Sequence, residues 1–299
     1  MNLQNLRIFL KVASLEHVTH AAEELHLSQP AVTKAIHSLE QEVHLDLVER
    51  QGRRIALTQA GRVLRDYAQR LFGLEREMEE ALSALRDVEG GEITFAANTT
   101  AWVYLLPPIV ARFRAYYPRV ALHVSILNSH EIVERTLNWT LDFGLIEGDM
   151  SHVPESLTVR LCKYDELTLV VAPGHPWSRR EAVLPADMGD QQLLLREQGS
   201  GLREIVEQGL QQCGVFVQPL FTLPDNEAIK QMVMSGVGAA VLSVLSVRRE
   251  LAQGDLVRIP IAGLDLRAQV GLVQRVDKHL SRAAEAFCSF IYSEIHSGL

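Results

Sequence analysis

The sequence has 299 residues, of which 47% are hydrophobic, and it carries a formal net charge of −8 from 29 Lys and Arg against 37 Asp and Glu. This length predicts two or three compact units with buried cores. The acidic balance excludes a chain whose whole surface is basic, so a nucleic acid or a membrane would have to meet a local patch.

Cysteine usage and the N-terminus predict a protein of the reducing cytoplasm. Cys162, Cys213 and Cys288 lie far apart and show no CxxC spacing, which indicates neither a disulfide framework nor a zinc site. The start of the chain, "MNLQNLRIFLKVASLEH", lacks the regions of a signal peptide, and no run approaches the roughly 18 apolar residues of a membrane span. We therefore expect a soluble, cytoplasmic protein with no membrane partner.

The N-terminal segment predicts successive short helices. The first runs from Leu3 to about Ser14, and a second follows Thr19, a candidate N-cap. A third helix is expected after the N-cap Ser28, with Pro30 in its first turn, where the missing N–H has no intrahelical partner to lose. Apolar residues recur along this third helix at steps of four, three and four, typical of one buried face: Val32, Ile36, Leu39 and Val43.

The second and third helices predict a helix-turn-helix whose outer face would lie in the major groove of DNA. A helical bundle with a solvated polar face fits the same spacing and remains an alternative. The stretch "ERQGRRIALT" then predicts a β-hairpin wing, on which Arg50, Arg53 and Arg54 would contact phosphates or the minor groove. The polar residues expected on the outer face of the third helix are Gln29, Thr33, Lys34 and His37.

A long helix is predicted from Thr58, a candidate N-cap, to Val88, and the glycines of "EGGE" would end it. Its apolar residues alternate in steps of four and three over more than three heptads, which is typical of a coiled-coil seam that needs a second helix. A long helix lying on its own domain is the alternative. The seam residues are Ala60, Leu64, Tyr67, Leu71, Leu74, Met78, Ala81 and Leu85.

This order of a winged helix-turn-helix, a long helix and a glycine break resembles the LysR-type transcriptional regulators. The strings "LSQPAV" and "LTQAG" carry the resemblance most specifically, and "LLPPIVARFRAYYP", "LREQGSG" and "DNEAIKQMVMSGVG" extend it along the chain. The resemblance implies a sequence-specific DNA-binding transcriptional regulator. The residues it implies at promoter DNA are Thr19, Ser28, Gln29, Pro30, Ala31, Thr33, Lys34, His37, Arg50, Arg53 and Arg54.

Several positions depart from the family pattern. Residues 16–18 read Glu-His-Val where Gly-Ser-Phe is frequent, His20 and Thr33 replace a basic residue and a serine, and Val48 replaces a phenylalanine. His44 stands where glycine usually follows the third helix. Because histidine enters the left-handed conformation more readily than most residues, we expect this turn to be kept. The departures affect the choice of operator sequence and not DNA binding itself.

The remainder of the chain, 92–299, alternates strands and helices in the order of a parallel, doubly wound sheet. The strands "ITFAAN", "VALHVSIL" and "DFGLI" are expected around a helix at 101–116, and a second set of strands begins at "ELTLVVAP". The strand "LRAQVGLVQ" and a helix at 281–296 would return to the first set. The resemblance implies two lobes of periplasmic-binding-protein-like architecture, with crossing strands near residues 163 and 266.

The predicted fold class is therefore α/β, with an N-terminal all-α winged helix-turn-helix and a two-lobed sensor of doubly wound α/β subdomains. The crossing strands would divide the sensor into lobe I and lobe II. The predicted domains are a DNA-binding domain at 1–58, a linker coiled-coil dimerisation helix at 59–91 and an effector-binding domain at 92–299, with lobe I at 92–163 and 267–299 and lobe II at 164–266.

Ligands of such sheets bind beyond the carboxyl ends of strands, where helix N-termini present free N–H groups. Hydroxyl groups there, with Arg196 as counter-charge, would form a cradle for a small anion or carboxylate. Each hydroxyl is equally explained as an ordinary N-cap, and Arg196 as a member of a surface ion pair. Glu147 could pair with Arg196, or it could face the cleft and disfavour a highly charged anion. The candidate effector-binding residues are Thr99, Thr100, Asn128, Ser129, Glu147, Arg196, Ser200 and Asn226.

Other classes of protein fit the sequence less well. The chain contains no GxSxG, HExxH, P-loop or GxGxxG motif and no histidine spacing typical of metal ligands, so we expect no catalysis, metal or cofactor. A transporter's solute-binding protein would need a signal peptide. Redox sensing through Cys162 and Cys213 is another possibility, although apolar neighbours such as Leu161 favour structural cysteines.

The expected assembly is a homodimer or a homotetramer built as a dimer of dimers, whose paired helix-turn-helices read an inverted repeat. Effector binding would favour one closure of the sensor cleft and so change the spacing or bend of the bound DNA.

Overall fold

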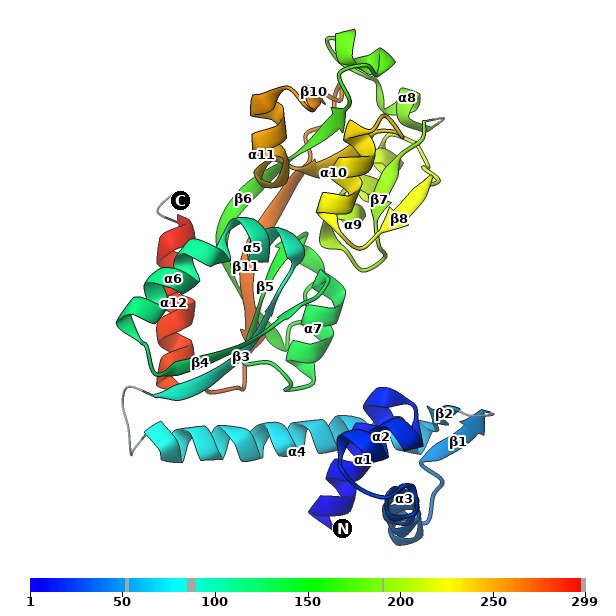
Figure 1. The fold of residues 1–299 in the computed structure, drawn as a ribbon, viewed down its shortest axis with the longest axis vertical. Helices are drawn as coiled ribbons and strands as arrows, with labels where there is room; N and C mark the ends of the chain where they lie inside the picture. The colour runs from blue at the N-terminus through cyan, green and yellow to red at the C-terminus, as the bar shows by residue number, and fades with distance from the viewer. Residues whose placement is uncertain (52–53, 85–89, 190, 297–299) are drawn as a thin grey trace. The chain divides into compact units, whose positions relative to one another are not determined.

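The computed structural model describes residues 1–51, 54–84, 90–189 and 191–296. The chain divides into two compact units, one formed by Met1–Glu79 with Asn138–Thr140 and the other by Glu80–Leu137 with the chain from Leu141 onward (Figure 1). Among the described residues, none of the helices combines the length and the apolarity that a membrane span requires.

The first unit contains a helix-turn-helix, a hairpin and a long helix (Figure 1). Its core is made by the inward faces of the first three helices, where Phe9, Val12, Val32 and Leu39 are fully buried. The hairpin is antiparallel, as the wing prediction requires. The elements are α1 (Leu3–Leu15), α2 (Val18–Glu24), α3 (Gln29–Val43), β1 (Val48–Gln51), β2 (Arg54–Leu57) and α4 (Gln59–Ala84).

The helix ends in this unit test the capping predictions. His44 ends α3 in the left-handed conformation at φ 56°, and its N–H donates to the carbonyl of Glu40, so the predicted turn is confirmed. The prediction that Thr19 caps α2 is wrong, because α2 begins at Val18 and the ring nitrogen Nδ1 of His17 accepts from the N–H of His20 at 3.4 Å.

The start of α4 agrees with its sequence signal. The hydroxyl of Thr58 accepts from the N–H of Gly61 at 3.0 Å and donates to the carbonyl of Asp46 at 2.6 Å. One side chain therefore caps the long helix and ties it to the loop that precedes the wing. The predicted C-terminal end of this helix, Leu85 to Val88, lies outside the described residues.

Lobe I of the second unit is a mixed sheet with helices on both faces (Figure 1). It contains β3 (Gly91–Ala97), α5 (Thr99–Tyr104), α6 (Leu106–Tyr116), β4 (Val120–Ile126), α7 (Ser129–Leu137), β5 (Phe143–Gly148), a 3-10 turn at Met150–His152, β11 (Arg267–Arg275) and α12 (Arg282–His296). Strand β3 pairs in parallel with β4 and β5, whereas β11 pairs antiparallel with β5. Both faces of the sheet are buried, since Phe95 and Ala97 of β3 lie in one hydrophobic cluster and Ala96 lies in another.

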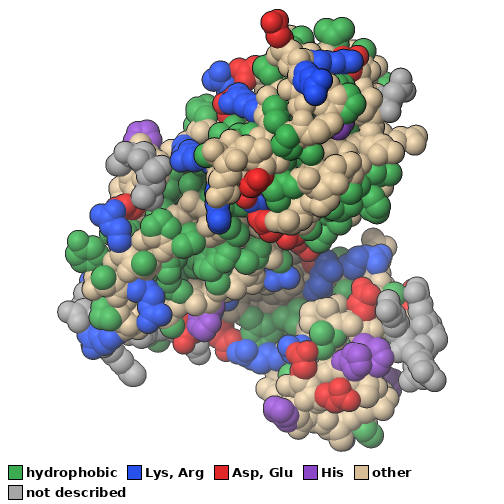
Figure 2. Space-filling model, turned by 45° about the horizontal axis from the view of Figure 1, so that its top comes forward, with side chains coloured by type: hydrophobic (Ala, Val, Ile, Leu, Met, Phe, Trp, Pro, Cys, Tyr) green, Lys and Arg blue, Asp and Glu red, His purple; other side chains and the backbone are tan. Residues whose placement is uncertain are grey.

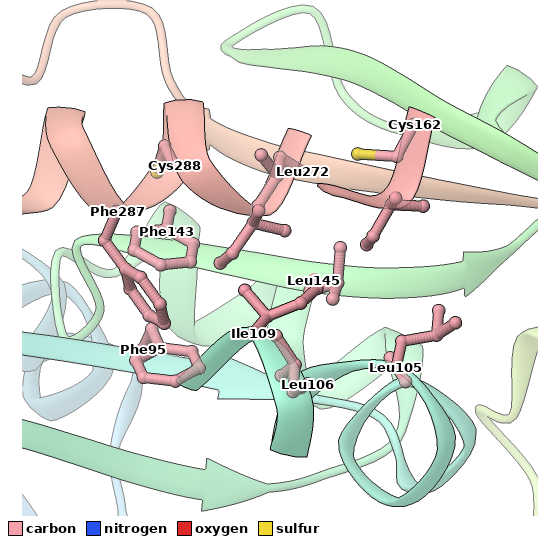
Figure 3. Packing of buried hydrophobic residues seen from close by; sticks show 14 of the residues in the cluster. Phe95, Leu105, Leu106, Ile109, Phe143, Leu145, Cys162, Leu272, Phe287 and Cys288 are labelled. Atoms are coloured by element: carbon pink, nitrogen blue, oxygen red, sulfur yellow. The ribbon is translucent and has the colours of Figure 1, made fainter. Parts of the chain in front are cut away.

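The larger core of lobe I is aromatic (Figure 3). The ring of Phe95 stacks on Phe143 with centroids 5.1 Å apart and meets the edge of Phe287 at 5.3 Å. The thiols of Cys162 and Cys288 border this core, and burial raises the pKa of both. Such thiols are poor nucleophiles, which supports the structural rather than the redox interpretation of Cys162.

The helix expected at 101–116 is interrupted, and that prediction is corrected. It begins earlier, at Thr99, and breaks at Leu105, after which α6 starts with Pro107 and Pro108 in its first turn. Proline lacks an N–H to donate and is tolerated only in the first turn of a helix, so the pair forces a new helix to start.

Lobe II is joined to lobe I by the long strand β6 (Leu157–Val171). The beginning of β6 pairs with β11, and its end pairs with two strands of lobe II, so one strand belongs to both lobes. Two helices and one strand of lobe II were not predicted from the sequence: α8 (Pro185–Gly189), α11 (Val244–Gln253) and β10 (Val257–Ile259). The further elements of lobe II are a 3-10 turn at Pro176–Arg179, α8 (Pro185–Gly189), β7 (Leu194–Arg196), α9 (Gly201–Gln212), β8 (Phe221–Leu223), α10 (Asn226–Met234), β9 (Ala240–Ser243), α11 (Val244–Gln253) and β10 (Val257–Ile259).

Candidate functional site

The third helix, α3, presents the candidate DNA-recognition face. The hydroxyl of Ser28 accepts from the N–H of Ala31 at 3.4 Å, and Pro30 lies in the first turn as predicted. Burial of Val32 and Leu39 fixes the rotation of the helix about its axis. Its opposite face is solvent-exposed, and this face carries Gln29, Pro30, Ala31, Thr33, Lys34 and His37.

Two neighbouring elements flank this face. Thr19 on α2 and Ser28 at the start of α3 are both exposed. Arg50 and Arg54 lie on the paired strands of the wing, whereas Arg53 lies outside the described residues. Histidine side chains are visible on the surface of this unit in Figure 2.

One face of α4 exposes large apolar side chains. Tyr67 and Leu74 are 64% and 60% exposed, which is unusual for residues of this size. Beside them, a groove of about 760 Å³ is lined by residues of α1, the end of α3 and α4. An exposed apolar stripe of this length is typical of an interaction surface. The exposed residues of this stripe are Val63, Tyr67, Leu71, Leu74, Met78 and Leu82.

In the second unit, side chains that follow two strands of lobe I donate hydrogen bonds to the backbone carbonyl of Glu147, near the end of a third strand. This carbonyl accepts from the hydroxyl of Ser129 at 3.0 Å and from the side-chain amide of Asn98 at 3.4 Å. Asn98 also caps α5, since its side-chain oxygen accepts from the N–H of Ala101 at 3.1 Å. Asn98 was not among the candidate effector-binding residues, although the segment 98–100 was expected at this edge of the sheet.

A chain of buried hydrogen bonds crosses between the lobes. The side-chain amide of Asn226 in lobe II donates to the hydroxyl oxygen of Thr100 in lobe I at 3.0 Å. Its carbonyl oxygen accepts from Nη1 of Arg196 at 2.8 Å. Thr100 and Asn226 are each only 1% exposed. Three of the predicted effector residues therefore form one continuous polar network.

Arg196 is a buried cation and not a surface one. It is 6% exposed, and it forms a two-pronged ion pair with Glu197 at 2.8 and 3.0 Å. The ion pair that the sequence left open does form, but its cation is buried, whereas the side chain of Glu197 is 23% exposed. Such bidentate geometry holds the guanidinium plane in one orientation.

The backbones of the two lobes also touch. A Cβ atom built on Gly201 would lie 2.4 Å from the carbonyl oxygen of Glu147 and 2.8 Å from Cα of Gly148. Nearby, the N–H of His130 donates to the carbonyl of Gly199 at 3.1 Å. Glycine is needed at 201 because no side chain fits between the two backbones. Next to this contact, a cavity of about 180 Å³ is lined by residues of both lobes, including Ser129 and Gly201.

A second contact between α5 and α10, that of Tyr104 with Lys230, lies one helical turn from the contact of Thr100 with Asn226. Lys230, four residues after Asn226, is 3% exposed and binds the carboxylates of Glu227 and Glu250 at 2.7 Å each. Its ammonium lies 5.8 Å from the ring centre of Tyr104, four residues after Thr100. The faces of α5 and α10 thus meet at two successive turns. Sequence spacing alone could have suggested this pairing only if both helices were known to face each other.

The remaining predicted residues lie close by but serve local structure as well. Asn128 caps α7, since its side-chain oxygen accepts from the N–H of Glu131 at 2.9 Å. Thr99 is half-buried in the first turn of α5. Ser200 is 4% exposed and precedes α9, but its hydroxyl makes no capping bond to that helix. Hydroxyl groups without a capping role are the ones free to bind a ligand.

The carboxyl group of Glu147 is the least expected feature of the site. It is fully buried, and among the described residues neither of its oxygens has a hydrogen-bond partner. Burial raises its pKa well above the usual range, the neighbouring Asp165 raises it further, and Thr100 and Arg196 lower it. The predicted pairing of Glu147 with Arg196 is therefore not formed as a hydrogen-bonded ion pair.

Comparison with known proteins places this architecture in a family. The model described as bacterial regulatory helix-turn-helix protein, lysR family, matches residues 3–62, and the LysR substrate binding domain matches 86–295. A RuBisCO operon transcriptional regulator of Allochromatium vinosum is 34% identical over 296 residues, which are 98% of this chain and 96% of the relative.

Solved structures share the fold at lower identity. Full-length CbnR complexed with its target DNA superposes with a TM-score of 0.66 at 22% identity and covers 98% of this chain and 100% of that chain. The regulatory domain of Synechocystis CcmR in complex with 2-PG has a TM-score of 0.62 at 24% identity, covering 68% of this chain and 96% of that chain.

A winged helix-turn-helix joined to a two-lobed α/β domain with a polar interlobe site defines a ligand-responsive DNA-binding protein. The chain belongs to the LysR family. It is a DNA-binding transcriptional regulator with an effector-binding domain, and the predicted fold class is confirmed.

Proposed function

We propose that this protein controls transcription of a carbon-fixation operon in the cytoplasm, in response to a small anionic or carboxylate effector, and that it has no catalytic activity of its own. The names of its relatives support the target, since the Allochromatium protein at 34% identity is a RuBisCO operon transcriptional regulator. The absence of catalytic motifs from the sequence supports the assignment as a regulator only.

DNA recognition rests on one observation, the continuous polar face of α3. Gln29, Thr33, Lys34 and His37 are all exposed on it. In the major groove, glutamine pairs with adenine edges and lysine with guanine. The arginines of the wing supply contacts to phosphates that do not depend on sequence.

The assembly we propose is a homodimer, or a tetramer of two dimers, held together by α4. The exposed stripe on α4 and the groove of about 760 Å³ beside it give a second copy of the same helix a place to bury its own stripe. In the proposed division, residues 1–58 read DNA and residues 59–91 dimerise. Residues 92–299 sense the effector, with lobe I at 92–163 and 267–299 and lobe II at 164–266.

The effector site we propose lies between the lobes, on the residues around Thr100, Ser129 and Ser200. Helix N-termini at α5, α7 and α9 present N–H groups there. An oxyanion could accept from these groups and from the hydroxyls. By replacing the bond between Asn226 and Thr100, it would change the closure of the lobes.

The test is recovery of the operator from fragmented DNA of the source organism, with the purified full-length protein at physiological salt. We expect an interrupted inverted repeat upstream of carbon-fixation genes. Gln29→Ala should lose discrimination among half-sites by about 1–3 kcal/mol. Gln4→Ala, an exposed glutamine on α1, is the matched control. Enrichment unrelated to carbon-fixation genes would refute the target, and an unchanged preference in Gln29→Ala would refute its role.

A further inference from the structure

The buried carboxyl group of Glu147 stands in a site that holds a second acid. On the sheet, Glu147 of β5 lies opposite Val270, and Asp165 of β6 lies opposite Ala268, two residues along the same strand β11. Directly opposed residues and those two apart share one face. Glu147 and Asp165 therefore lie on the same face of the sheet, on either side of β11.

The groups that face this pair come from both lobes. Asp165 is 6% exposed and accepts a hydrogen bond from Ser243 of β9. Thr100 of α5 and Arg196 of β7 lower the pKa of the Glu147 carboxyl group. Arg196 is the cation among these groups, and its charge is already matched by the two-pronged pair with Glu197.

This charge balance leaves no counter-ion for an ionised Glu147. A buried carboxylate that no counter-ion pairs with is strongly disfavoured, and a second carboxyl group beside it adds repulsion. The favourable state is a neutral carboxylic acid, which can donate a hydrogen bond. Burial and Asp165 raise the pKa of Glu147 accordingly.

We propose that Glu147 is a proton-carrying specificity residue of the effector site: with its proton it donates a hydrogen bond to an oxygen of an anionic effector, and without it the site repels the anion. This deepens the proposed function and rests on it for the class of effector. Affinity for an anion then falls as pH rises, by up to tenfold per pH unit where one proton is taken up with the ligand.

The proton itself is tested without any ligand. In the folded protein Glu147 keeps a proton that the unfolded chain releases above about pH 4.5, so stability falls as pH rises toward the folded pKa. We expect the ratio of the unfolding equilibrium constants of the full-length parent and Glu147→Gln to rise by up to tenfold per pH unit above about pH 5, and to level off where folded Glu147 loses its proton. Glu204→Gln, an exposed glutamate of α9, should give a flat ratio. A flat ratio for Glu147→Gln as well would overturn the proposal.

A second variant tests whether the pH dependence of stability comes from the proton on Glu147 or from altered packing. Asp165→Asn removes the neighbouring acid but keeps Glu147, so the pH-dependent fall should persist and move to lower pH. If Asp165→Asn instead left the position of the fall unchanged, the two carboxyl groups would not interact and the proposal would be wrong.

Ligand coupling is tested with 2-phosphoglycolate by calorimetry at two pH values about one unit apart, both above about pH 7.5, where its phosphate is fully ionised, and both above the pH at which the unfolding ratio levels off. There free Glu147 is ionised, so the parent should lose up to tenfold in affinity over this interval, and Glu147→Gln less than twofold. Equal losses in both proteins would overturn the role of Glu147. Absence of binding by both proteins at either pH would refute the anionic effector of the proposed function, while the unfolding ratios still decide whether Glu147 holds the proton.

Discussion

Replacing Gly201 by alanine should force the two sensor lobes apart. The added Cβ would lie 2.4 Å from the carbonyl oxygen of Glu147 and 2.8 Å from Cα of Gly148, and both are backbone atoms of the other lobe. Backbone cannot rotate away as a side chain can, so the closed arrangement should lose about 2 kcal/mol, within the range for overpacked sites. This corresponds to about 30-fold in the population of the closed arrangement.

Gly209→Ala on the same helix is the matched control. Its Cβ would meet the methyl Cδ2 of Leu266 at 2.5 Å, the movable end of a side chain, and alanine is about 1 kcal/mol better than glycine inside a helix. Gly209→Ala should therefore be near neutral.

The assay is hydrogen exchange of the N–H of His130, which donates across the lobes to the carbonyl of Gly199 at 3.1 Å. We expect exchange about 30-fold faster in Gly201→Ala and unchanged in Gly209→Ala. Equal exchange in the two variants would show that the glycine contact does not hold the lobes together.

Three further predictions concern other regions of the molecule. Leu74→Asp places a charge in the exposed stripe of α4 and should yield monomers in sedimentation, whereas a parent that is itself monomeric would remove the basis for α4 dimerisation. Asn226→Ala leaves Arg196 without one acceptor and should lower the free energy of unfolding by about 2–4 kcal/mol in urea titrations; a loss below about 1 kcal/mol would mean that water replaces the bond. Phe287→Ala removes a fully buried aromatic ring and should lower the free energy of unfolding by about 3–5 kcal/mol. A loss near zero would contradict the packing in Figure 3.

The helix-turn-helix followed from local sequence signals. A capping serine, a first-turn proline and one apolar face are properties of short segments, and α3 forms at Gln29–Val43 with Ser28 as its cap. The same holds for the long helix, whose cap Thr58 reads directly from the sequence. Errors arose where several local solutions compete, as at the start of α2, where His17 and not Thr19 provides the cap.

For the site between the lobes, local sequence signals identified residues but did not predict which of them bond to one another. Thr100, Arg196 and Asn226 were identified because they follow strands or begin helices, but their mutual bonds join segments up to 126 residues apart in the chain. No local pattern encodes a pairing of that kind. The carboxylate that pairs with Arg196, that of its direct neighbour Glu197, was missed for the same reason, since adjacency in sequence does not predict that two side chains form an ion pair.

The sequence by itself determined the class of protein, because periodicity, caps and motifs act within one or two turns of a chain. The tertiary structure alone decided the chemistry of the sensor. It placed Glu147 and Asp165 on one sheet face, buried Arg196 while pairing it with Glu197, and brought Gly148 against Gly201. Burial and the distance between charges set protonation and affinity, and both quantities exist only once distant segments have packed.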